Sequence, residues 1–252
     1  MEQTYRFADK NVRIVPLYNA VHALCKDYAV PTSGYDFAVC TSSTDIDFER
    51  ERSAQTDALE GRPVRQSSDA YLETLAVYRK IAEKMPDYDT VLFHGSCVAV
   101  DGAAYLFIAK SGTGKSTHTR LWRELLGERA VMVNDDKPLI RITDGGAVIY
   151  GTPWDGKHRL SANIAVPLKA VCVLERAAEN SIRPISTNEA YPMLLQQVYR
   201  PMDGGAMSKT LVLVDRLTAA VKLWKLGCNT QIEAAQVAYD AMKGQTDHEA
   251  ER

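Results

Sequence analysis

The chain has 252 residues, 46% of them hydrophobic, which is enough for one large domain or for one domain with a smaller companion. Its formal net charge of −2 lacks the basic surplus that nucleic acids and anionic membranes attract, so we expect neither as a partner. The five cysteines are scattered without Cys-x-x-Cys spacing, which argues against a zinc set or a disulfide framework and is typical of a reducing cytoplasm.

Residues 1–65 are expected to form a small α/β module. Its start lacks the apolar segment of a signal peptide, so we expect a cytoplasmic protein. The pattern predicts strands at 12–17 and 36–40, a short helix at 19–28, and a charge-dense, solvated helix or loop at 44–55. No catalytic cluster stands out in this module, which favours a role in substrate shaping or dimerisation.

A larger domain, residues 66–252, is expected after the break at Gly61-Arg62-Pro63. Apolar residues recur with a helical period from 69 to 85, which predicts an amphipathic helix that ends before Pro86 and packs on the following sheet. Three strands are then expected at 90–93, 96–100 and 103–108.

Asp101-Gly102 joins the last two of these strands and is a strong signal of a two-residue hairpin. The strand at 103–108 is therefore expected to be paired antiparallel, unlike its counterpart in the common parallel-sheet nucleotide hydrolases. Because the hairpin returns the chain toward its start, we expect His94 to lie beside the segment that follows residue 108. The alternative for a lone histidine is a structural role.

The segment that follows, Ala-Lys-Ser-Gly-Thr-Gly-Lys-Ser-Thr at 109–117, has the pattern of a phosphate-binding loop (P-loop), with Ala109 where the usual pattern has glycine. A helix-like run to Leu126 comes next. Glycines let successive N–H groups converge on one anion, and a helix start adds partial positive charge. We expect Lys115 to reach the β- and γ-phosphates and Ser116 to ligate Mg²⁺. The alternative is a tight glycine turn that only caps a helix. The expected nucleotide-binding residues are Ser111, Gly112, Thr113, Gly114, Lys115, Ser116 and Thr117.

Two adjacent carboxylates, Asp135 and Asp136, follow Asn134 and a short buried strand expected at 130–133. Such a pair is unfavourable at a strand end unless a cation or hydrogen-bond donors balance its charge. At a metal–phosphate centre, one carboxylate holds Mg²⁺ and the other accepts the proton of an incoming hydroxyl. We assign the metal to Asp136 and the proton to Asp135. An Asx-turn at the strand end is the alternative.

The segment Gly-Thr-Pro-Trp-Asp-Gly-Lys-His-Arg at 151–159 combines rigid-loop residues with three basic side chains, which indicates a loop that faces an anion. We expect Lys157 and Arg159 to stabilise the charge of a transferred phosphoryl group. A surface turn is the alternative.

The remaining chain alternates between strand and helix patterns. A capping box, Ser-x-x-Glu from Ser186, starts a helix that is expected to reach Tyr199. The fold class is therefore expected to be α/β, with a mixed, largely antiparallel central sheet, a P-loop and flanking helices, plus the small N-terminal α/β module. Further strands are expected at 139–143, 147–150, 168–174, 182–185 and 221–226, and further helices at 209–218 and 230–242.

His94-Gly95-Ser96, the hairpin, the loop at 111–117 and Asn134-Asp135-Asp136 together resemble the HPr kinase/phosphorylase and phosphoenolpyruvate carboxykinase superfamily. The loop string is most similar to that of the carboxykinases, whereas the size and layout are closer to the catalytic domain of HPr kinase. The resemblance covers roughly residues 90–175. It extends to small HPr-kinase-like proteins that are linked to modified-peptide gene clusters.

This resemblance implies the fold of the HPr kinase C-terminal domain, ATP with Mg²⁺ or Mn²⁺ as cofactors, and Asp135 as the general base. It also implies that His94 and Asp136 lie near the metal and the terminal phosphate. HPr kinases form hexamers as a family, so a homo-oligomer is implied. Neither the acid-gripping residues of the carboxykinases nor the carrier-docking segment of HPr kinase is matched. The candidate catalytic residues are His94, Lys115, Asp135, Asp136, Lys157 and Arg159.

We therefore expect a kinase that phosphorylates a hydroxyl group, either of a small molecule or of a seryl side chain in a peptide or protein. Two alternatives remain. A simple nucleoside-triphosphate hydrolase would turn over ATP without an acceptor, and a non-catalytic nucleotide-sensing or peptide-binding module would need Lys115 and the loop but no base. No base-reading motif is visible, so ADP, GTP and pyrophosphate remain alternatives to ATP as the donor.

Overall fold

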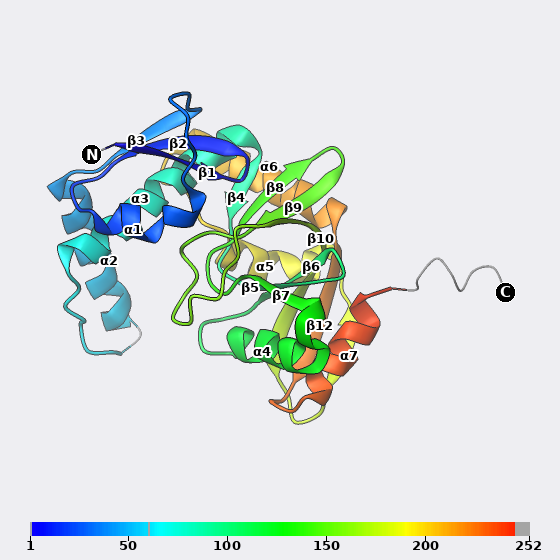
Figure 1. Ribbon diagram of the computed structural model, residues 1–252. Coiled ribbons are helices and arrows are strands. Elements are labelled where there is room, and N and C mark those ends of the chain that lie inside the picture. Colours follow the sequence, from blue (N-terminus) through cyan, green and yellow to red (C-terminus); the bar gives the residue numbers. More distant parts are fainter. Residues whose placement is uncertain (1, 60, 245–252) are drawn as a thin grey trace. The chain divides into compact units, whose positions relative to one another are not determined.

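A computed structural model describes residues 2–59 and 61–244 of the chain. The chain divides into two compact units, of which the first ends at Met85 and the second begins at Pro86 (Figure 1). The division thus lies after the helix expected at 69–85 and not near residue 65. Within the described residues, no helix is both long enough and apolar enough to cross a membrane.

The first unit contains a small sheet in which β2 (Lys10–Val15) lies between β1 (Gln3–Phe7) and β3 (Phe37–Cys40). β1 is antiparallel to β2, and β3 is parallel to it. β1 was not expected from the sequence, and the charge-dense segment at 44–55 is part of a regular helix. The helices of this unit are α1 (Ala20–Leu24), α2 (Ser43–Leu59) and α3 (Asp69–Lys84), with a 3₁₀ turn at Lys26–Tyr28.

Helix α3 is tied to the first unit by a buried carboxylate. Glu73 is fully buried and accepts hydrogen bonds from the backbone N–H groups of Leu17 (2.5 Å) and Tyr18 (2.8 Å) and from the Thr41 hydroxyl (2.5 Å). These donors replace the water that a buried carboxylate loses. The helix packs against α1, α2 and β3. The apolar periodicity of this segment had suggested packing on the following sheet. Periodicity counts apolar residues only, so it could not reveal the contacts of the buried Glu73.

The second unit is built on a mixed, largely antiparallel sheet with the strand order β4-β8-β9-β10-β6-β5-β7, which confirms the expected fold class. The start of the long strand β10 (Ala165–Arg176) pairs antiparallel with β9, and the rest of it runs parallel to β6 and to β12. β11 pairs antiparallel with β12. The other strands are β4 (Thr90–Leu92), β5 (Ser96–Val100), β6 (Ala103–Ile108), β7 (Ala130–Asn134), β8 (Leu139–Thr143), β9 (Gly146–Tyr150), β11 (Ser181–Pro184) and β12 (Lys222–Cys228).

Helices cover both faces of this sheet (Figure 1). α5 and α6 share a core with one face, and α4 and α7 share a core with the other. On β6, Leu106 and Ile108 belong to the first core, and Tyr105 and Phe107 belong to the second. Burial on both sides explains why this strand is an uninterrupted apolar run. The helices are α4 (Lys115–Leu126), α5 (Thr187–Gln197), α6 (Gly204–Ala220) and α7 (Glu233–Met242).

Aromatic rings fasten α4 to the sheet. Trp122 is fully buried, and its ring centroid lies 4.9 Å from that of Tyr105 and 5.3 Å from that of Phe107. Its indole N–H donates a 3.0 Å hydrogen bond to Nε2 of His118, which is buried on the same helix. Aromatic contacts of this kind stabilise beyond the area that they bury. Because α4 begins in the predicted P-loop, this packing fixes the helical end of that loop.

Candidate functional site

The segment expected to bind phosphate connects the end of β6 to Lys115, the first residue of α4. Gly112 and Gly114 have φ angles of +76° and +124°, which residues with a side chain rarely adopt. Ala109 is buried and has no positive φ, so a methyl group is tolerated where the usual pattern has glycine. The strand, the glycine loop and the helix are thus arranged as the motif requires.

The start of α4 offers its N–H groups to an anion. No side chain of the described residues caps this helix at Gly114. Lys115 is buried, and its Nζ donates a 3.1 Å hydrogen bond to the Ala109 carbonyl. Burial lowers the pKa of Lys115, while the charges of Asp136 and Asp135 oppose that shift. A buried lysine beside uncapped helix N–H groups suits a phosphate group.

An arginine from β10 braces the loop from outside. The Arg176 guanidinium donates to the Gly112 carbonyl at 2.5 Å and to the Thr113 carbonyl at 3.3 Å. Both acceptors lie in the glycine-rich turn, so these bonds hold its backbone in place, as does the 3.2 Å hydrogen bond from the Thr113 N–H to the Lys110 carbonyl. Sequence reasoning did not single out Arg176, because the parallel pairing that brings the end of β10 to the end of β6 is not visible in the sequence.

Antiparallel pairing brings the carboxylates to His94. The hairpin at Asp101-Gly102 is present, with φ angles of +51° and +81°, and β5 also pairs antiparallel with β7. Residues at the start of β5 therefore lie beside those that follow β7. The Ser96 hydroxyl donates a 2.6 Å hydrogen bond to Oδ1 of Asp135, and Nε2 of His94 lies 3.4 Å from Oδ1 of Asp136.

The charges around His94 favour its neutral form. Burial lowers its pKa, and the positive charges of Lys115 and Lys137 lower it further, while Asp136 opposes them. A neutral ring has one nitrogen that donates and one that accepts a hydrogen bond. Lys137 also contacts Asp136, with 3.6 Å between Nζ and Oδ2.

Asn134 holds the turn that carries both carboxylates. Its Oδ1 accepts hydrogen bonds from the N–H groups of Asp136 (2.8 Å) and Lys137 (2.6 Å), and its Nδ2 donates to the carbonyl and hydroxyl oxygens of Thr152. The Asx-turn considered as an alternative is thus present, and it is made by Asn134. The carboxylates of Asp135 and Asp136 take no part in the hydrogen bonds of this turn.

The loop at 151–159 lies against this turn. A Cβ atom on Gly156, which has a φ of +75°, would lie 3.4 Å from Cβ of Asp136. Buried Asp155 closes the loop, because its Oδ2 accepts hydrogen bonds from the backbone N–H (3.2 Å) and the hydroxyl (2.9 Å) of Ser161. Lys157 and Arg159 are exposed on this loop.

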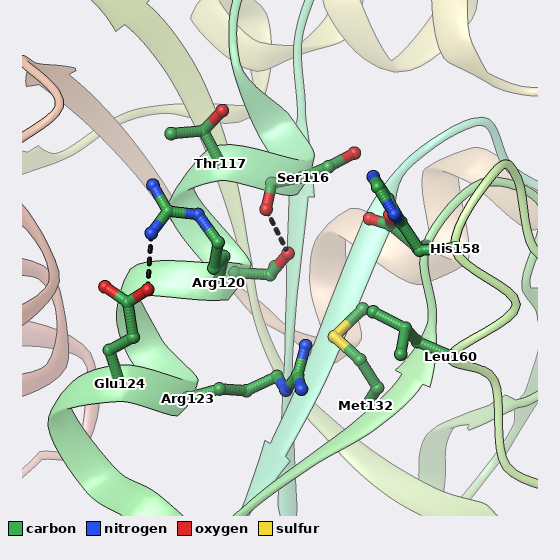
Figure 2. Close-up of a pocket in the computed structure, with 10 residues that line it drawn as sticks. Ser116, Thr117, Arg120, Arg123, Glu124, Met132, His158 and Leu160 are labelled. Atoms are coloured by element: carbon green, nitrogen blue, oxygen red, sulfur yellow. Dashed lines mark hydrogen bonds and ion pairs between the residues drawn. The ribbon is translucent and has the colours of Figure 1, made fainter.

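Two cavities open beside the P-loop. The first, which we call the Asp135 cavity, has a volume of about 530 Å³ (Figure 2). The second, the Arg176 cavity, has a volume of about 490 Å³. The Asp135 cavity is lined by Ser116, Thr119, Arg123, Met132, Asp135 and His158, among others. The Arg176 cavity is lined by Lys110, Thr113, Val173, Arg176, Ile185 and Met193, among others.

The expected site residues come together only in part. The loop at 111–117, His94, Asp135 and Asp136 share one end of the sheet. Lys157 and Arg159 do not line the Asp135 cavity, whereas His158 between them does. Sequence reasoning missed Arg123, although Ser116 and Arg123 are seven residues apart on one helix and so share a face. Within the described residues, no three His, Cys, Asp or Glu side chains form a cluster that could hold a metal ion.

Comparisons with known proteins bear on the family. A structure of the Hpr(Ser) kinase/phosphatase from Coxiella burnetii aligns with a TM-score of 0.32 and 9% identity, over 61% of this chain and 99% of that one. A search of curated protein sequences gave no match. The model of the family described as "SynChlorMet cassette protein ScmC" matches residues 65–225, which is more than half of the chain. The chain therefore belongs to the ScmC family.

Proposed function

We propose that this protein is a kinase that transfers the terminal phosphoryl group of ATP to a hydroxyl group, with Mg²⁺ as its metal and Mn²⁺ as the alternative. The observation that carries the proposal is the Asp135–Asp136 pair at the end of β7, electrostatically coupled to buried Lys115. A module that only binds nucleotide needs Lys115 and the loop N–H groups but no such pair. The resemblance of these residues to those of HPr kinases supports the same reaction class.

The donor phosphates would lie on the loop at 111–117, with Lys115 at the β- and γ-phosphates. Ser116 and Asp136 would hold Mg²⁺, which would neutralise phosphate charge. Asp136 suits this task because its carboxylate contacts Lys137 and interacts electrostatically with Lys115, which would bind the same phosphates.

In the transfer step, the acceptor oxygen attacks the γ-phosphorus, and the bond from that phosphorus to the β–γ bridging oxygen breaks, so that ADP leaves. The hydroxyl proton passes to Asp135. Asp135 is placed to accept this proton, because its carboxylate forms no ion pair within the described part of the chain and lines the same cavity as Ser116, the proposed metal ligand. Lys157 and Arg159 supply positive charge from the neighbouring loop.

The test is phosphorus NMR of ATP and Mg²⁺ with the protein, with and without L-serine or a seryl peptide. The proposal predicts a phosphomonoester signal that grows with ADP only when an acceptor is present, and no signal with Lys115→Met. Inorganic phosphate that forms at the same rate without acceptor would identify a hydrolase. Nucleotide binding without turnover would identify a sensing module. Parallel runs with GTP, ADP and pyrophosphate identify the donor.

We expect this reaction in the cytoplasm, where ATP is abundant. The five cysteines are all free, as they are in a reducing compartment.

A further inference from the structure

A half-buried arginine without a partner lines the cavity that contains the proposed general base. Arg123 lies on α4, and its side chain forms no hydrogen bond or ion pair within the part of the chain that the structure describes. Figure 2 shows its side chain extended toward the side of the cavity where Met132 and His158 lie. Its guanidinium N–H groups are therefore available to a molecule bound in the cavity.

The other arginine that lines the cavity already has a partner. Arg120 forms an ion pair with Glu124 on the exposed side of α4 (Figure 2), so these two charges cancel. Asp135 accepts the hydrogen bond of Ser96 and is the proposed proton acceptor. Among the lining residues that the structure describes, Arg123 is thus the arginine that has no acidic partner.

The position of the cavity assigns it to the acceptor. It is lined by both Ser116, the proposed metal ligand, and Asp135, so it meets the terminal phosphate, where the hydroxyl must attack. The Arg176 cavity contains neither residue. Its apolar lining by Val173, Ile185 and Met193 beside the loop suits the nucleoside of the donor instead.

We propose that Arg123 anchors a carboxylate of the acceptor, so that the substrate carries a hydroxyl and a carboxylate in one molecule. This inference rests on the proposed kinase function. The planar guanidinium binds a carboxylate through two parallel hydrogen bonds. A single carboxylate balances the single unpaired cation, whereas a phosphate would add a further negative charge beside Asp135 and Glu124. A free hydroxy amino acid and a peptide with a seryl carboxyl terminus both supply this chemistry.

The test compares acceptors that differ only in the carboxylate. N-acetyl-L-serine, N-acetyl-L-serinamide and a pentapeptide with a free seryl carboxyl terminus are titrated calorimetrically into protein loaded with Mg²⁺ and a non-hydrolysable ATP analogue. We expect the acid to bind about ten- to a hundredfold more tightly than the amide. Arg123→Gln should reduce this preference to about twofold or less, and Arg123→Lys should keep part of it, because lysine retains charge but not the two-pronged geometry. The pentapeptide shows whether the carboxylate comes from a peptide.

Arg129→Gln is the matched control, because Arg129 is an exposed arginine just after α4 that pairs with Asp101. It should leave the preference unchanged. Equal affinity for acid and amide, or binding of neither, would overturn the inference, as would a loss of nucleotide affinity in Arg123→Gln with an unchanged preference. A protein that binds nucleotide but shows no preference keeps the proposed function and loses this inference. A protein that shows the preference but binds no nucleotide would keep a carboxylate site at Arg123 but would contradict the proposed function and with it the role of that carboxylate as part of an acceptor.

Discussion

The Ser96 hydroxyl donates a 2.6 Å hydrogen bond to the Asp135 carboxylate, 39 residues further along the chain. The same hydroxyl lies 2.8 Å from the Thr119 hydroxyl on α4. One serine at the start of β5 therefore connects the carboxylate after β7 with the second turn of α4. This contact sets the position of the proposed base relative to Ser116, which is three residues before Thr119.

The two aspartates are predicted to respond differently to metal. Asp136→Asn removes the proposed metal ligand, so it should raise the Mg²⁺ concentration needed for activity, and excess metal should partly restore the rate. Asp135→Asn removes the proposed base, so it should lower the rate 10²- to 10⁴-fold at saturating Mg²⁺ with little change in nucleotide affinity. The measurement is rate against Mg²⁺ concentration for the three proteins. Rescue of Asp135→Asn alone would reverse the roles, and full activity of both variants would make the pair structural.

Gly151 is predicted to be irreplaceable because backbone atoms surround it. A Cβ atom there would lie 1.8 Å from the Ala162 carbonyl oxygen and 2.7 Å from that of Val133. Gly151→Ala should therefore destabilise the protein by more than about 3 kcal/mol in urea unfolding. Gly145→Ala is the control, because its nearest neighbour is the Thr143 hydroxyl at 3.8 Å, and it should change stability by less than about 0.5 kcal/mol. Similar effects of both substitutions would contradict the packing described here.

His118 is predicted to make stability depend on pH. Its burial lowers the pKa to about 4, against 6.5 for an exposed histidine, so the unfolded chain binds the proton first. Protonation of His118 therefore does not reduce the free energy of unfolding well above pH 6.5, and it reduces that free energy progressively as the pH drops toward 4. Between pH 7.5 and 5 this group should cost about 2 kcal/mol. His118→Gln keeps an acceptor for the Trp122 N–H. Between pH 7.5 and 5, its free energy of unfolding in urea should therefore fall by about 2 kcal/mol less than that of the wild type. Identical pH dependence of both proteins would show that His118 titrates normally.

The sequence could predict features that are determined by residues close together in the chain. The glycine-rich turn before α4 and the hairpin at Asp101-Gly102 depend on neighbouring residues, and the sequence patterns located them. The turn at Asn134 was only an alternative in the interpretation of the sequence. The fold class followed from the same hairpins, because they impose antiparallel pairing.

Features that depend on distant contacts were not predicted. The bond from Arg176 to Gly112 requires the parallel pairing of β10 with β6, which no local pattern encodes. The division of the chain follows α3, which the buried carboxylate of Glu73 ties to the first unit, and amphipathic periodicity carries no information about that contact. Arg123 looked like an ordinary surface residue of α4, because its lack of a partner appears only in three dimensions.

The most direct test of the proposed donor site is thermal unfolding with and without ATP and Mg²⁺, for the wild type and Lys115→Met. Lys222→Met, which changes an exposed lysine on β12, is the control. At about 100 times its dissociation constant, a ligand stabilises the folded state by about 2.7 kcal/mol. For a chain of this size, that raises the melting temperature by roughly 5–10 °C. The proposed donor site predicts this rise for the wild type and Lys222→Met and its loss in Lys115→Met. An equal rise in all three proteins, or no rise in the wild type, would contradict a nucleotide site on this loop.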